Sequence, residues 1–336
     1  MVNAFIFNHN PTIPLVTASF MTPGQKLRQL LQEPGLLICP GVHDCLSAQI
    51  AEQVGFEVIF TSGFGISAST LGRPDYGFLT ATEMLYSVSR IVQGVKIPLV
   101  ADIDTGYGNP LNVIRTVTEA VLLGVAGVIL EDQEWPKKCG HFQGKRVIPA
   151  EEHIEKIKAA VKARGESGLV IIGRTDARAP LGLEEAIRRG RAYFEAGADI
   201  VFIEAPQSVE ELKAIAAAFP DAPLFANAIE GGKTPLMSPP ELEALGYKIA
   251  VFPLAGLFSA TKAIADCYKY LKEHGTTVGF DRLLNFQQFE QIINISQYRQ
   301  LEQEFSVNPT TNPTTNPTTN PTTNSTTKPH PEASEH

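Results

Sequence analysis

Acidic side chains end two neighbouring apolar segments of the sequence, and their types and spacing fit a metal ion. Asp102 and Asp104 close "PLVADID", and Glu131 closes "GVILE". Residues two apart in an extended strand point to the same face, so we expect Asp102 and Asp104 to lie together. Carboxylate oxygens are ligands that Mg²⁺ accepts, usually while it keeps several waters. The three side chains therefore predict a magnesium site, although an Asp-x-Asp pair on its own also fits a turn.

Two further segments could hold an anionic substrate. Arg174 lies in "LVIIGRTD", and its planar guanidinium can hold a carboxylate with two parallel hydrogen bonds. A structural ion pair with Asp176 or Glu204 is the alternative, and the sequence leaves both open. The segment "TSGFG", residues 61–65, offers a hydroxyl and successive backbone N–H groups for an anionic oxygen, or it forms a plain turn.

The segment "EDQEWPKKCGHFQGKRV", residues 131–147, concentrates reactive groups. It holds three lysines, an arginine, Cys139, His141 and the only tryptophan. A thiol flanked by Lys138 and His141 can have its pKa tuned by neighbouring charge, which fits a proton donor or a nucleophile. A zinc site is not favoured, because Cys139 and His141 have no second Cys/His pair at usable spacing. Because "KKCG" lacks apolar residues that would fix a loop, the segment predicts a lid that closes over substrate.

The elements that would position these residues are short apolar segments separated by amphipathic helical patterns. Eight of them begin at residues 36, 58, 98, 127, 169, 200, 224 and 249. Continuously apolar strands between helices are typical of a parallel sheet covered on both faces. Eight such units within about 250 residues favour a closed (β/α)8 TIM-type barrel of the α/β class over an open doubly wound sheet.

Polar residues stand at the ends of most of these segments. In a (β/α)8 barrel the carboxyl ends of the strands meet at one mouth, which holds the active site. Several charged strand ends in register are hard to explain by solvation alone, so they predict one shared site. The segment ends carry, in order, Asp44, Ser62 with Gly63, Asp102 with Asp104, Glu131 with Asp132, Arg174 with Asp176, Glu204, Asn227 and Pro253.

Charge and composition narrow the class of protein. The formal net charge of -8 and a pI near 5.5 argue against a nucleic-acid or anionic-membrane partner, which would favour a basic face. Four scattered cysteines indicate a reducing compartment rather than a disulfide framework. No apolar run approaches the roughly 20 residues that span a bilayer, and the first twenty residues lack the Lys and Arg of a signal or transit peptide. These features predict a cytoplasmic protein that acts on small molecules.

The two ends of the chain differ from its middle. The repeat "NPTTNPTTNPTT", from Asn308 onward, has no apolar side chain to bury and is expected to be disordered. The Pro- and Asn-rich start is expected to be poorly ordered as well. We therefore predict a flexible extension over 1–22, a barrel with C-terminal helices over 23–305 and a disordered tail over 306–336.

Seven motifs, in this order and spacing, resemble the isocitrate lyase/phosphoenolpyruvate mutase superfamily. They are "SGF", "LGRPDYG", "ADIDTGYG", "LEDQ", "PKKCGH", "GRTDA" and "EAP". The resemblance runs from about residue 25 to 305, and the Lys-Lys-Cys-Gly-His segment is its most specific part. It implies a (β/α)8 barrel that acts with Mg²⁺ on bonds beside the carboxylate of α-keto acids. It also implies a homotetramer, a dimer of dimers in which the last helix packs on a neighbouring subunit.

The resemblance also implies roles for individual residues. The carboxylates around Mg²⁺ match Asp102 and Asp104, with Asp75 and Glu131 in the supporting shell. The groups that bind the keto-acid carboxylate match Ser62, Gly63 and Phe64. The polar wall of the site matches Arg174, Glu204 and Asn227. The gating loop, whose cysteine protonates the departing carbanion in the lyases, matches Lys137, Cys139 and His141.

A few positions bear on the choice of reaction. Methylisocitrate lyases have a tyrosine two residues before Ser62, where this chain has Phe60, and their "SGG" is "SGF" here. Phosphoenolpyruvate mutases carry Asn-Ser in place of Cys139-Gly140, and oxaloacetate-hydrolysing relatives tend to have serine at Pro253. The pattern is closest to petal-death-like proteins, those of the carboxyvinyl-carboxyphosphonate phosphorylmutase type and methylisocitrate lyase-like members.

The sequence therefore predicts a Mg²⁺-dependent carbon–carbon lyase with Cys139 as its proton donor. The expected substrate is a small 2-hydroxy dicarboxylate or related keto acid, of the 2-alkylmalate or methylisocitrate kind, cleaved to an α-keto acid and a carboxylate. The alternatives are a phosphonomutase and an oxaloacetate hydrolase or decarboxylase on the same barrel. A non-catalytic binding protein is less expected, because the metal carboxylates, Arg174 and Cys139 are all present.

Overall fold

The computed structural model describes residues 21–306. They belong to two compact units that divide between Ile293 and Asn294. The first unit contains the eight strands, and the described part of the second is a single helix. Apart from Met21, Thr22 and Ser306, the predicted extension over 1–22 and tail over 306–336 lie outside the described residues.

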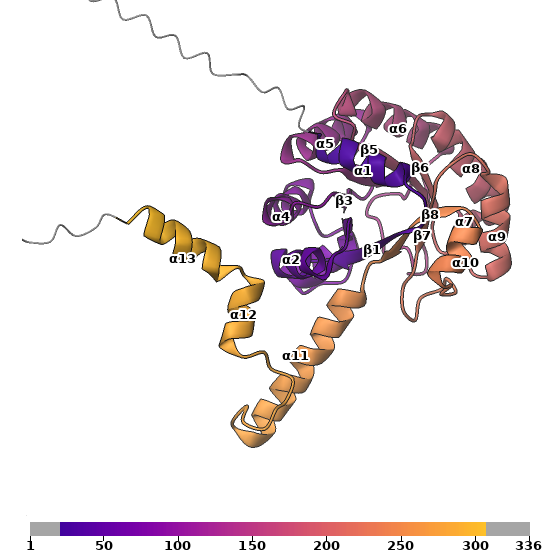
Figure 1. The fold of residues 1–336 in the computed structure, drawn as a ribbon. Coiled ribbons are helices and arrows are strands. Elements are labelled where there is room, and N and C mark those ends of the chain that lie inside the picture. The colour runs from indigo at the N-terminus through magenta and orange to yellow at the C-terminus, as the bar shows by residue number, and fades with distance from the viewer. Residues whose placement is uncertain (1–20, 307–336) are drawn as a thin grey trace, which may run out of the picture. The chain divides into compact units, whose positions relative to one another are not determined.

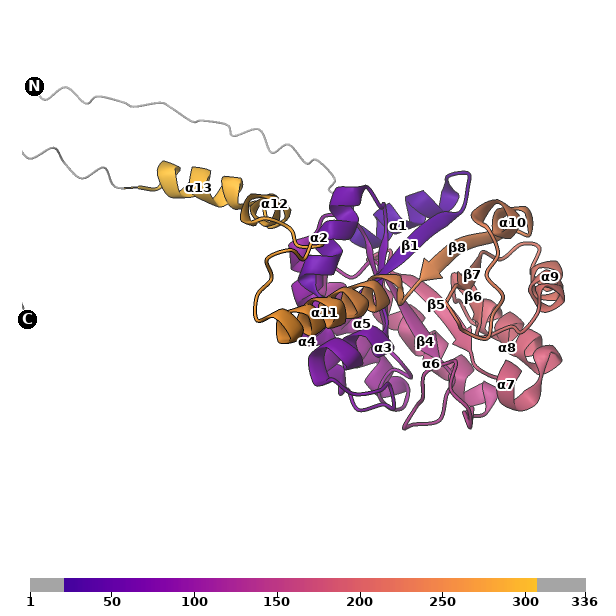
Figure 2. The same cartoon turned by 90° about the horizontal axis from the view of Figure 1, so that it is seen from below.

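The eight predicted strands form a closed parallel barrel (Figures 1 and 2). Each strand pairs in parallel with the next along the chain, and β8 pairs with β1. This arrangement confirms the (β/α)8 barrel. The strands are β1 Leu37–Val42, β2 Ile59–Thr61, β3 Leu99–Asp102, β4 Gly127–Glu131, β5 Val170–Thr175, β6 Ile200–Ile203, β7 Leu224–Asn227 and β8 Tyr247–Phe252.

Helices connect consecutive strands and cover the outside of the barrel (Figure 1), as parallel strands require. After β2 the connection contains a short helix and a π-helical turn, and after β5 it contains two helices. The connecting helices are α2 Cys45–Val54, α3 Gly63–Ile66, η1 Ser67–Leu71, α4 Ala81–Gly94, α5 Pro110–Leu123, α6 Ala150–Arg164, α7 Arg178–Leu181, α8 Leu183–Glu195, α9 Val209–Ala218 and α10 Pro239–Ala244.

The strands are apolar without interruption because both of their faces are buried. Val100 and Ile129 pack in the barrel interior. Ala101 and Val128, one position away along the same strands, belong to the cluster that includes Val113 of α5. The unbroken apolar runs of the sequence therefore reflect one core inside the barrel and two clusters between the strands and the helices.

The helix α1 (Pro23–Gln32) closes the amino end of the barrel. Its Leu27 and Leu30 belong to the same buried cluster as the interior residues of the strands. Arg28 donates from Nε to the carbonyl of Gly168, just before β5, at 2.7 Å. With this end filled, the carboxyl end of the barrel remains for a ligand, as is usual in this fold.

The predicted C-terminal helices follow the barrel. α11 (Ala255–His274) begins directly after β8, contacts β1 and projects from the barrel (Figures 1 and 2), with Phe258, Ile264 and Tyr268 exposed. α12 (Phe286–Ile292) lies beside α2, where Gln53 donates to the carbonyl of Ile292 at 2.7 Å. α13 (Ile295–Glu304) is the helix of the second unit. Within residues 21–306 no helix is long and apolar enough to cross a membrane.

Candidate active site

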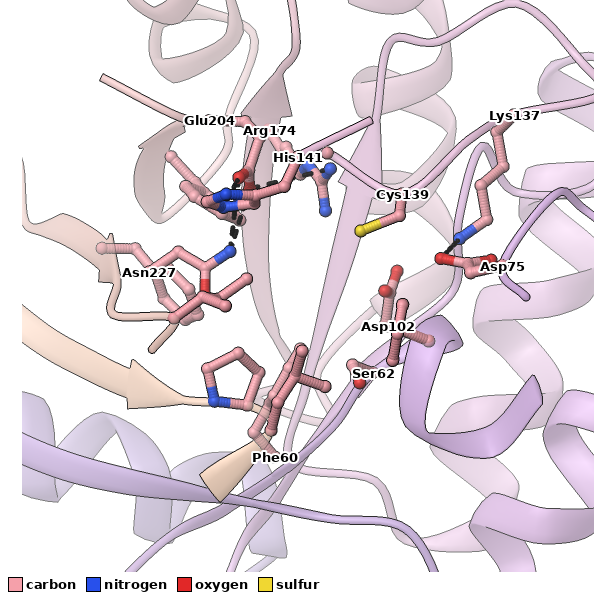
Figure 3. A pocket seen from close by; sticks show the side chains of 17 residues that line it. Phe60, Ser62, Asp75, Asp102, Lys137, Cys139, His141, Arg174, Glu204 and Asn227 are labelled. Atoms are coloured by element: carbon pink, nitrogen blue, oxygen red, sulfur yellow. Dashed lines mark hydrogen bonds and ion pairs between the residues drawn. The ribbon is translucent and has the colours of Figure 1, made fainter. Parts of the chain in front are cut away.

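A cavity lies at the carboxyl end of the barrel (Figure 3). Its empty volume, which includes open solvent at the mouth, is about 480 Å³. The ends of β2, β3 and β5 to β8 contribute to its wall, together with the segment that follows β4. The lining residues are Phe60, Ser62, Phe64, Asp75, Asp102, Lys137, Cys139, Gly140, His141, Arg174, Phe202, Glu204, Phe225, Asn227, Ile229, Pro253 and Leu254.

Most of the predicted site residues line this cavity, and the other three contact residues that do. Gly63 bonds to Asp102, Asp104 pairs with Lys137, and Glu131 pairs with Arg174. The structure thus brings together residues that are up to about 165 positions apart in the sequence, from Ser62 to Asn227.

The lining divides into two polar groups and an apolar wall. Figure 3 shows Cys139 between the two polar groups. The acidic group consists of Asp75, Asp102 and Lys137, and the arginine group of His141, Arg174, Glu204 and Asn227. The apolar wall consists of Phe60, Phe202, Phe225, Ile229, Pro253 and Leu254.

Lys137 joins two buried carboxylates. Its Nζ lies 2.7 Å from Asp75 Oδ2 and 2.6 Å from Asp104 Oδ1. Burial raises the pKa of Asp104 to about 7, and Lys137 opposes that rise. Burial lowers the pKa of Lys137, but Asp104 and Asp75 outweigh it and hold that pKa well above its usual range. The three charges are stable as a set, since removal of one partner would leave an unpaired buried charge.

Asp102 is held by backbone groups at the end of β3. Its Oδ1 accepts the N–H of Asp104 at 3.0 Å, and its Oδ2 accepts the N–H of Gly63 at 3.1 Å. The prediction that strand alternation aligns Asp102 with Asp104 is wrong, because β3 ends at Asp102 and Asp104 has a left-handed φ of 50°. This bend directs the Asp104 carboxylate toward Lys137 instead.

The "TSGFG" segment is used differently from the expectation. The Gly63 N–H bonds to Asp102, and the Gly65 N–H bonds to Ser62 Oγ at 2.9 Å, so these two donors do not face a substrate anion. Ser62 caps α3 with its oxygen, which leaves its own hydroxyl proton for a ligand. A Cβ on Gly63 would lie 2.7 Å from Lys137 Nζ, so the close approach of Lys137 requires glycine there.

Glu131 is buried with spare hydrogen-bonding capacity. Its Oε2 lies 3.1 Å from Arg174 Nη2, whereas its Oε1 has no hydrogen-bond partner among the described residues. Burial raises the pKa of Glu131 well above its usual range, although Arg174 opposes this. A buried polar atom without a partner is uncommon and calls for an additional group such as water or a cation.

The carboxylates fit Mg²⁺ in one particular way. No three His, Cys, Asp or Glu side chains within residues 21–306 lie close enough together to hold a metal directly. The predicted set of Asp102, Asp104 and Glu131 is therefore not a three-ligand cluster. Mg²⁺ is usually bound by one or two carboxylates and keeps several waters. Asp102 at the cavity wall, with Asp75 beside it and the partnerless oxygen of Glu131 behind, matches that donor set.

Arg174 forms the ion pair that the sequence left as an alternative. Its Nε lies 2.9 Å from Asp176 Oδ2, and its Nη2 lies 3.2 Å from Asp176 Oδ1. Glu131 and Glu204 also face Nη2, at 3.1 and 3.7 Å. The guanidinium packs over the Phe202 ring, 5.2 Å from its centroid. One bidentate edge of Arg174 is thus occupied by the protein, although the side chain still lines the cavity.

His141 and Asn227 orient the carboxylate of Glu204. The Lys233 N–H donates to His141 Nδ1 at 3.0 Å, so Nε2 carries the ring proton, and it lies 3.0 Å from Glu204 Oε1. Asn227 Nδ2 lies 3.3 and 3.2 Å from the two Glu204 oxygens. Burial alone would raise the pKa of Glu204, but Arg174 and His141 lower it below its usual range. Glu204 is therefore an anion at neutral pH.

The loop that was predicted to be a lid lies against the cavity. The Cys139 N–H donates to the carbonyl of Asp75 at 3.1 Å, and its side chain is buried with sulfur in the cavity (Figure 3). A Cβ on Gly140 would lie 2.6 Å from Glu204 Cδ, so the loop backbone rests against the arginine group. Burial raises the pKa of Cys139 to about 11. Of the two predicted roles, this thiol therefore fits the proton donor, since a nucleophile needs the thiolate.

Besides Gly63, Asp104 and Glu131, three more strand-end residues are absent from the cavity lining. Asp44 caps α2 by accepting the Ser47 N–H at 2.7 Å. Asp176 lies behind Arg174, and Asp132 faces the outer side of β4, where α8 covers it. Strand ends alone therefore identified the mouth but did not tell which side of the wall each side chain occupies.

Two parts of the chain that contact the site residues were not predicted from the sequence. Lys145 is fully buried between Asp176 and the loop, and the segment around Gly232 and Lys233 covers His141. Lys145 was visible as one of the loop cations, but nothing in its spacing separates it from its exposed neighbours. No residue pattern links 232–233 to the loop, because the contact depends on how two loops fold over one another.

The sequence profile of the family described as phosphoenolpyruvate phosphomutase matches residues 27–271. The chain belongs to this family. The matched region runs from α1 into α11 and contains every residue that lines the cavity. It confirms the resemblance that the motifs indicated.

Two relatives are each 45% identical to this chain. The 2,3-dimethylmalate lyase of Eubacterium barkeri is 45% identical over 287 residues, which cover 85% of this chain and 99% of the relative. The petal death protein of Dianthus caryophyllus is 45% identical over 281 residues, which cover 83% of this chain and 88% of the relative. With the methylisocitrate lyases among the further relatives, the prediction of an enzyme, a carbon–carbon lyase of this superfamily, is confirmed.

Solved structures of family members superpose on the barrel. Oxaloacetate acetylhydrolase in complex with 3,3-difluorooxalacetate gives a TM-score of 0.80 at 37% identity, covering 84% of this chain and 97% of that one. Phosphonopyruvate hydrolase in complex with oxalate and Mg²⁺ gives a TM-score of 0.77 at 31% identity, covering 85% and 99%. By their names, these relatives act on small dicarboxylates or keto acids.

Proposed function

We propose that this family member is a Mg²⁺-dependent lyase that cleaves a 2-alkylmalate to an α-keto acid and a carboxylate. The observation that carries the proposal is the Cys139 thiol, which is buried, keeps its proton and faces a cavity with two polar groups and an apolar wall. A thiol in that state can protonate a carbanion but is a poor nucleophile.

The lining supports a dicarboxylate that carries an alkyl group. Lys137 and Arg174, the two permanent cations of the lining, each already face carboxylates of the protein. This leaves little positive charge for the three carboxylates of methylisocitrate, and it favours a substrate with two. The apolar wall, with Phe60 and Pro253, offers burial to an alkyl substituent at about 0.8 kcal/mol per CH₂ group.

Asp102 is the residue that we propose as the Mg²⁺ ligand. Asp75, Asp104 and Glu131 surround it and would reach the ion through water. A related hydrolase has been solved with Mg²⁺ and oxalate, which supports a divalent ion in this barrel mouth. When bound, Mg²⁺ supplies a Lewis acid that polarises the oxygen destined to become the keto group.

Side chains of the protein carry out the proton transfers and orient the substrate. Asp75 or Asp102 accepts the proton of the C2 hydroxyl, the C2–C3 bond breaks, and its electron pair stays on C3 beside the departing carboxylate. C2 then becomes the carbonyl carbon of the keto acid. Cys139 donates its thiol proton to C3. After the loop opens, the carboxylate releases the proton that it took to water and the thiolate regains one from water, so both groups return to their starting states. Ser62 and Arg174 orient the substrate carboxylates.

Hydrolysis of oxaloacetate is a second candidate, because oxaloacetate acetylhydrolase is similar to this chain in structure and sequence. Pro253 argues against it. This side chain lines the cavity and has no O–H or N–H group to orient an attacking water. A phosphonate rearrangement is less supported, since it gives the protonated thiol of Cys139 no role.

For the assembly we propose a homotetramer. The exposed apolar side chains of α11, Phe258, Ile264 and Tyr268, support a partner subunit that covers this helix. A sizing column coupled to light scattering tests this, and a monomer at micromolar concentration would contradict it. The four cysteines, all free, support a reducing compartment such as the cytoplasm.

A substrate panel tests the proposed reaction. The enzyme with Mg²⁺ is given oxaloacetate, 2-methylmalate, 2,3-dimethylmalate, methylisocitrate, isocitrate and phosphoenolpyruvate, and keto-acid release is followed. We expect pyruvate from the two alkylmalates, loss of that activity in EDTA, and no phosphonate signal in phosphorus NMR. Turnover of phosphoenolpyruvate or of oxaloacetate alone would replace the proposal with one of its alternatives.

A further inference from the structure

Lys145 is a buried cation that the proposed chemistry does not use. Its side chain is 0% exposed, and its Nζ lies 2.6 Å from Asp176 Oδ1 and 2.5 Å from the carbonyl oxygen of Gly140. Gly140 is the residue after Cys139, so Lys145 holds the backbone right beside the thiol. A buried ammonium is stable only when paired, and these two acceptors are what pairs it.

Lys145 stands on the fixed base of the gating loop, whereas Gly140 is part of its tip. Gln133 and Val147 form an antiparallel bridge at the base, and the Glu134 N–H donates to the carbonyl of Arg146 at 2.9 Å. The two sides of this base are therefore bonded to each other. The bond from Lys145 to Gly140 crosses from the base to the tip.

Asp176 connects this bond to the cavity. One of its oxygens accepts from Arg174 Nε, and the other accepts from Lys145. Its backbone N–H donates to Asp132 Oδ1 at 2.8 Å, which fixes Asp176 to the outer wall. Lys145 is thus held next to the arginine group by Asp176.

We propose that Lys145 is a positioning residue that latches the loop tip shut by binding the Gly140 carbonyl, so that the Cys139 thiol faces the cavity. Lys145 does not line the cavity, and its effect on the reaction passes through Gly140. The catalytic consequence rests on the proposed role of Cys139, but the position of the loop can be measured without any substrate.

Lys145→Met tests the latch, because it keeps the apolar stem and removes the donor. The readout is the rate at which iodoacetamide alkylates Cys139 in the whole protein, followed by peptide mass spectrometry. Half-buried Cys45, in α2, serves as an internal reference in each sample. We expect alkylation of Cys139 to accelerate at least about tenfold relative to Cys45, since the thiol reacts when the tip opens.

Lys138→Met is the matched control. Lys138 belongs to the same loop, but its Nζ bonds to the carbonyl of Gly144 at 3.2 Å and faces solvent. We expect its Cys139 rate to stay within about twofold of the unmodified sequence. Equal rates for Lys145→Met and the unmodified protein would overturn the latch, and so would equal acceleration by Lys138→Met.

A milder variant keeps the test open if Lys145→Met does not fold. Lys145→Gln retains an N–H donor on a shorter stem, and we expect at least about threefold faster alkylation of Cys139. No acceleration in a folded Lys145→Gln would overturn the proposal. Once a malate that the enzyme cleaves has been identified, we expect the Lys145 variants to show a larger change in kcat than in KM. Failure to find a cleaved malate would count against the proposed function only, because the alkylation result stands by itself.

Discussion

Glu131 and Asp132 are neighbours at the end of β4, yet they lie on opposite sides of the barrel wall. Both are almost fully buried, at 1% and 0% exposure. On the inner side, Glu131 pairs with Arg174 through one oxygen, and the other has no partner in the described part of the chain. On the outer side, Asp132 accepts hydrogen bonds from Thr175 Oγ1, Asp176 N–H, Arg189 Nη1 and Tyr193 Oη, at 2.7 to 3.0 Å.

Glu131 and Asp132 differ in how many of their hydrogen-bonding positions are filled, not in burial or charge. This number therefore distinguishes the structural carboxylate from the one that can bind a ligand. Burial raises the pKa of both residues, so the direction of the shift does not distinguish them. Asp132 has four donors and no capacity for another partner. Glu131 keeps an unused oxygen next to the cavity, at a cost to stability that a functional site can explain.

Asp132→Ala, on the outer side of the wall, should have the largest effect on stability. It leaves Arg189 and the Tyr193 hydroxyl buried without their acceptor, so we expect the free energy of unfolding to fall by about 4 kcal/mol. Urea unfolding followed by circular dichroism measures it. Asp44→Ala, which removes an exposed helix cap, is the control and should cost about 1 kcal/mol. A loss from Asp132→Ala no larger than that of the control would show that the outer cluster is not structural.

Glu131→Gln tests the inner side. The amide keeps the shape but removes the charge that we propose near Mg²⁺, so kcat/KM is expected to fall at least about 100-fold, or about 2.7 kcal/mol. The free energy of unfolding should change by less than about 1 kcal/mol, because no saturated cluster is broken. Glu134→Gln, at an exposed carboxylate of the same segment, serves as control. Normal activity in Glu131→Gln would remove Glu131 from the site.

The pH dependence of Cys139 alkylation tests whether this thiol, in the cavity, is protonated at neutral pH. Because burial raises the pKa of Cys139 to about 11, the thiol is protonated at neutral pH and the reactive thiolate is scarce. The rate of alkylation should therefore rise about tenfold per pH unit from about pH 7 to 10. Iodoacetamide and peptide mass spectrometry give this profile, and a plateau near pH 8 would mean an ordinary exposed thiol.

Tyr193→Phe should have the smallest effect. It removes one of the four donors to Asp132 and leaves the other three, so the free energy of unfolding is expected to fall by about 1 kcal/mol. Turnover should stay the same, since the hydroxyl lies on the outer side of the wall. The same urea titration and the malate assay measure both, and a tenfold drop in turnover would mean that the outer cluster shapes the site.

The barrel was predictable from sequence because each strand is recognisable from its own short apolar run. A strand buried on both faces must be apolar throughout, and eight such runs allow few architectures. The position of the cavity followed from the same geometry, since strand ends converge on one mouth. The presence of the cysteine-bearing loop over this mouth was also predictable, because the loop directly follows the fourth apolar segment.

The pairing of side chains was not predictable, because it depends on distances between segments far apart in sequence. Arg174 could have faced substrate or Asp176, and only the fold shows that one edge of its guanidinium is occupied. The left-handed turn at Asp104 breaks the strand period that aligned it with Asp102. Lys145 resembles any surface lysine until Asp176, 31 positions later, is placed beside it.

Cys139, as we propose, supplies the proton that completes carbon–carbon cleavage in this mouth. The most direct test is to follow 2-methylmalate with Mg²⁺ in D₂O by proton NMR, using the unmodified enzyme and Cys139→Ser. We predict pyruvate and singly deuterated acetate from the former, and formation at least about 1,000-fold slower by an equally stable Cys139→Ser. Pyruvate released by Cys139→Ser at the rate of the unmodified enzyme would contradict the account.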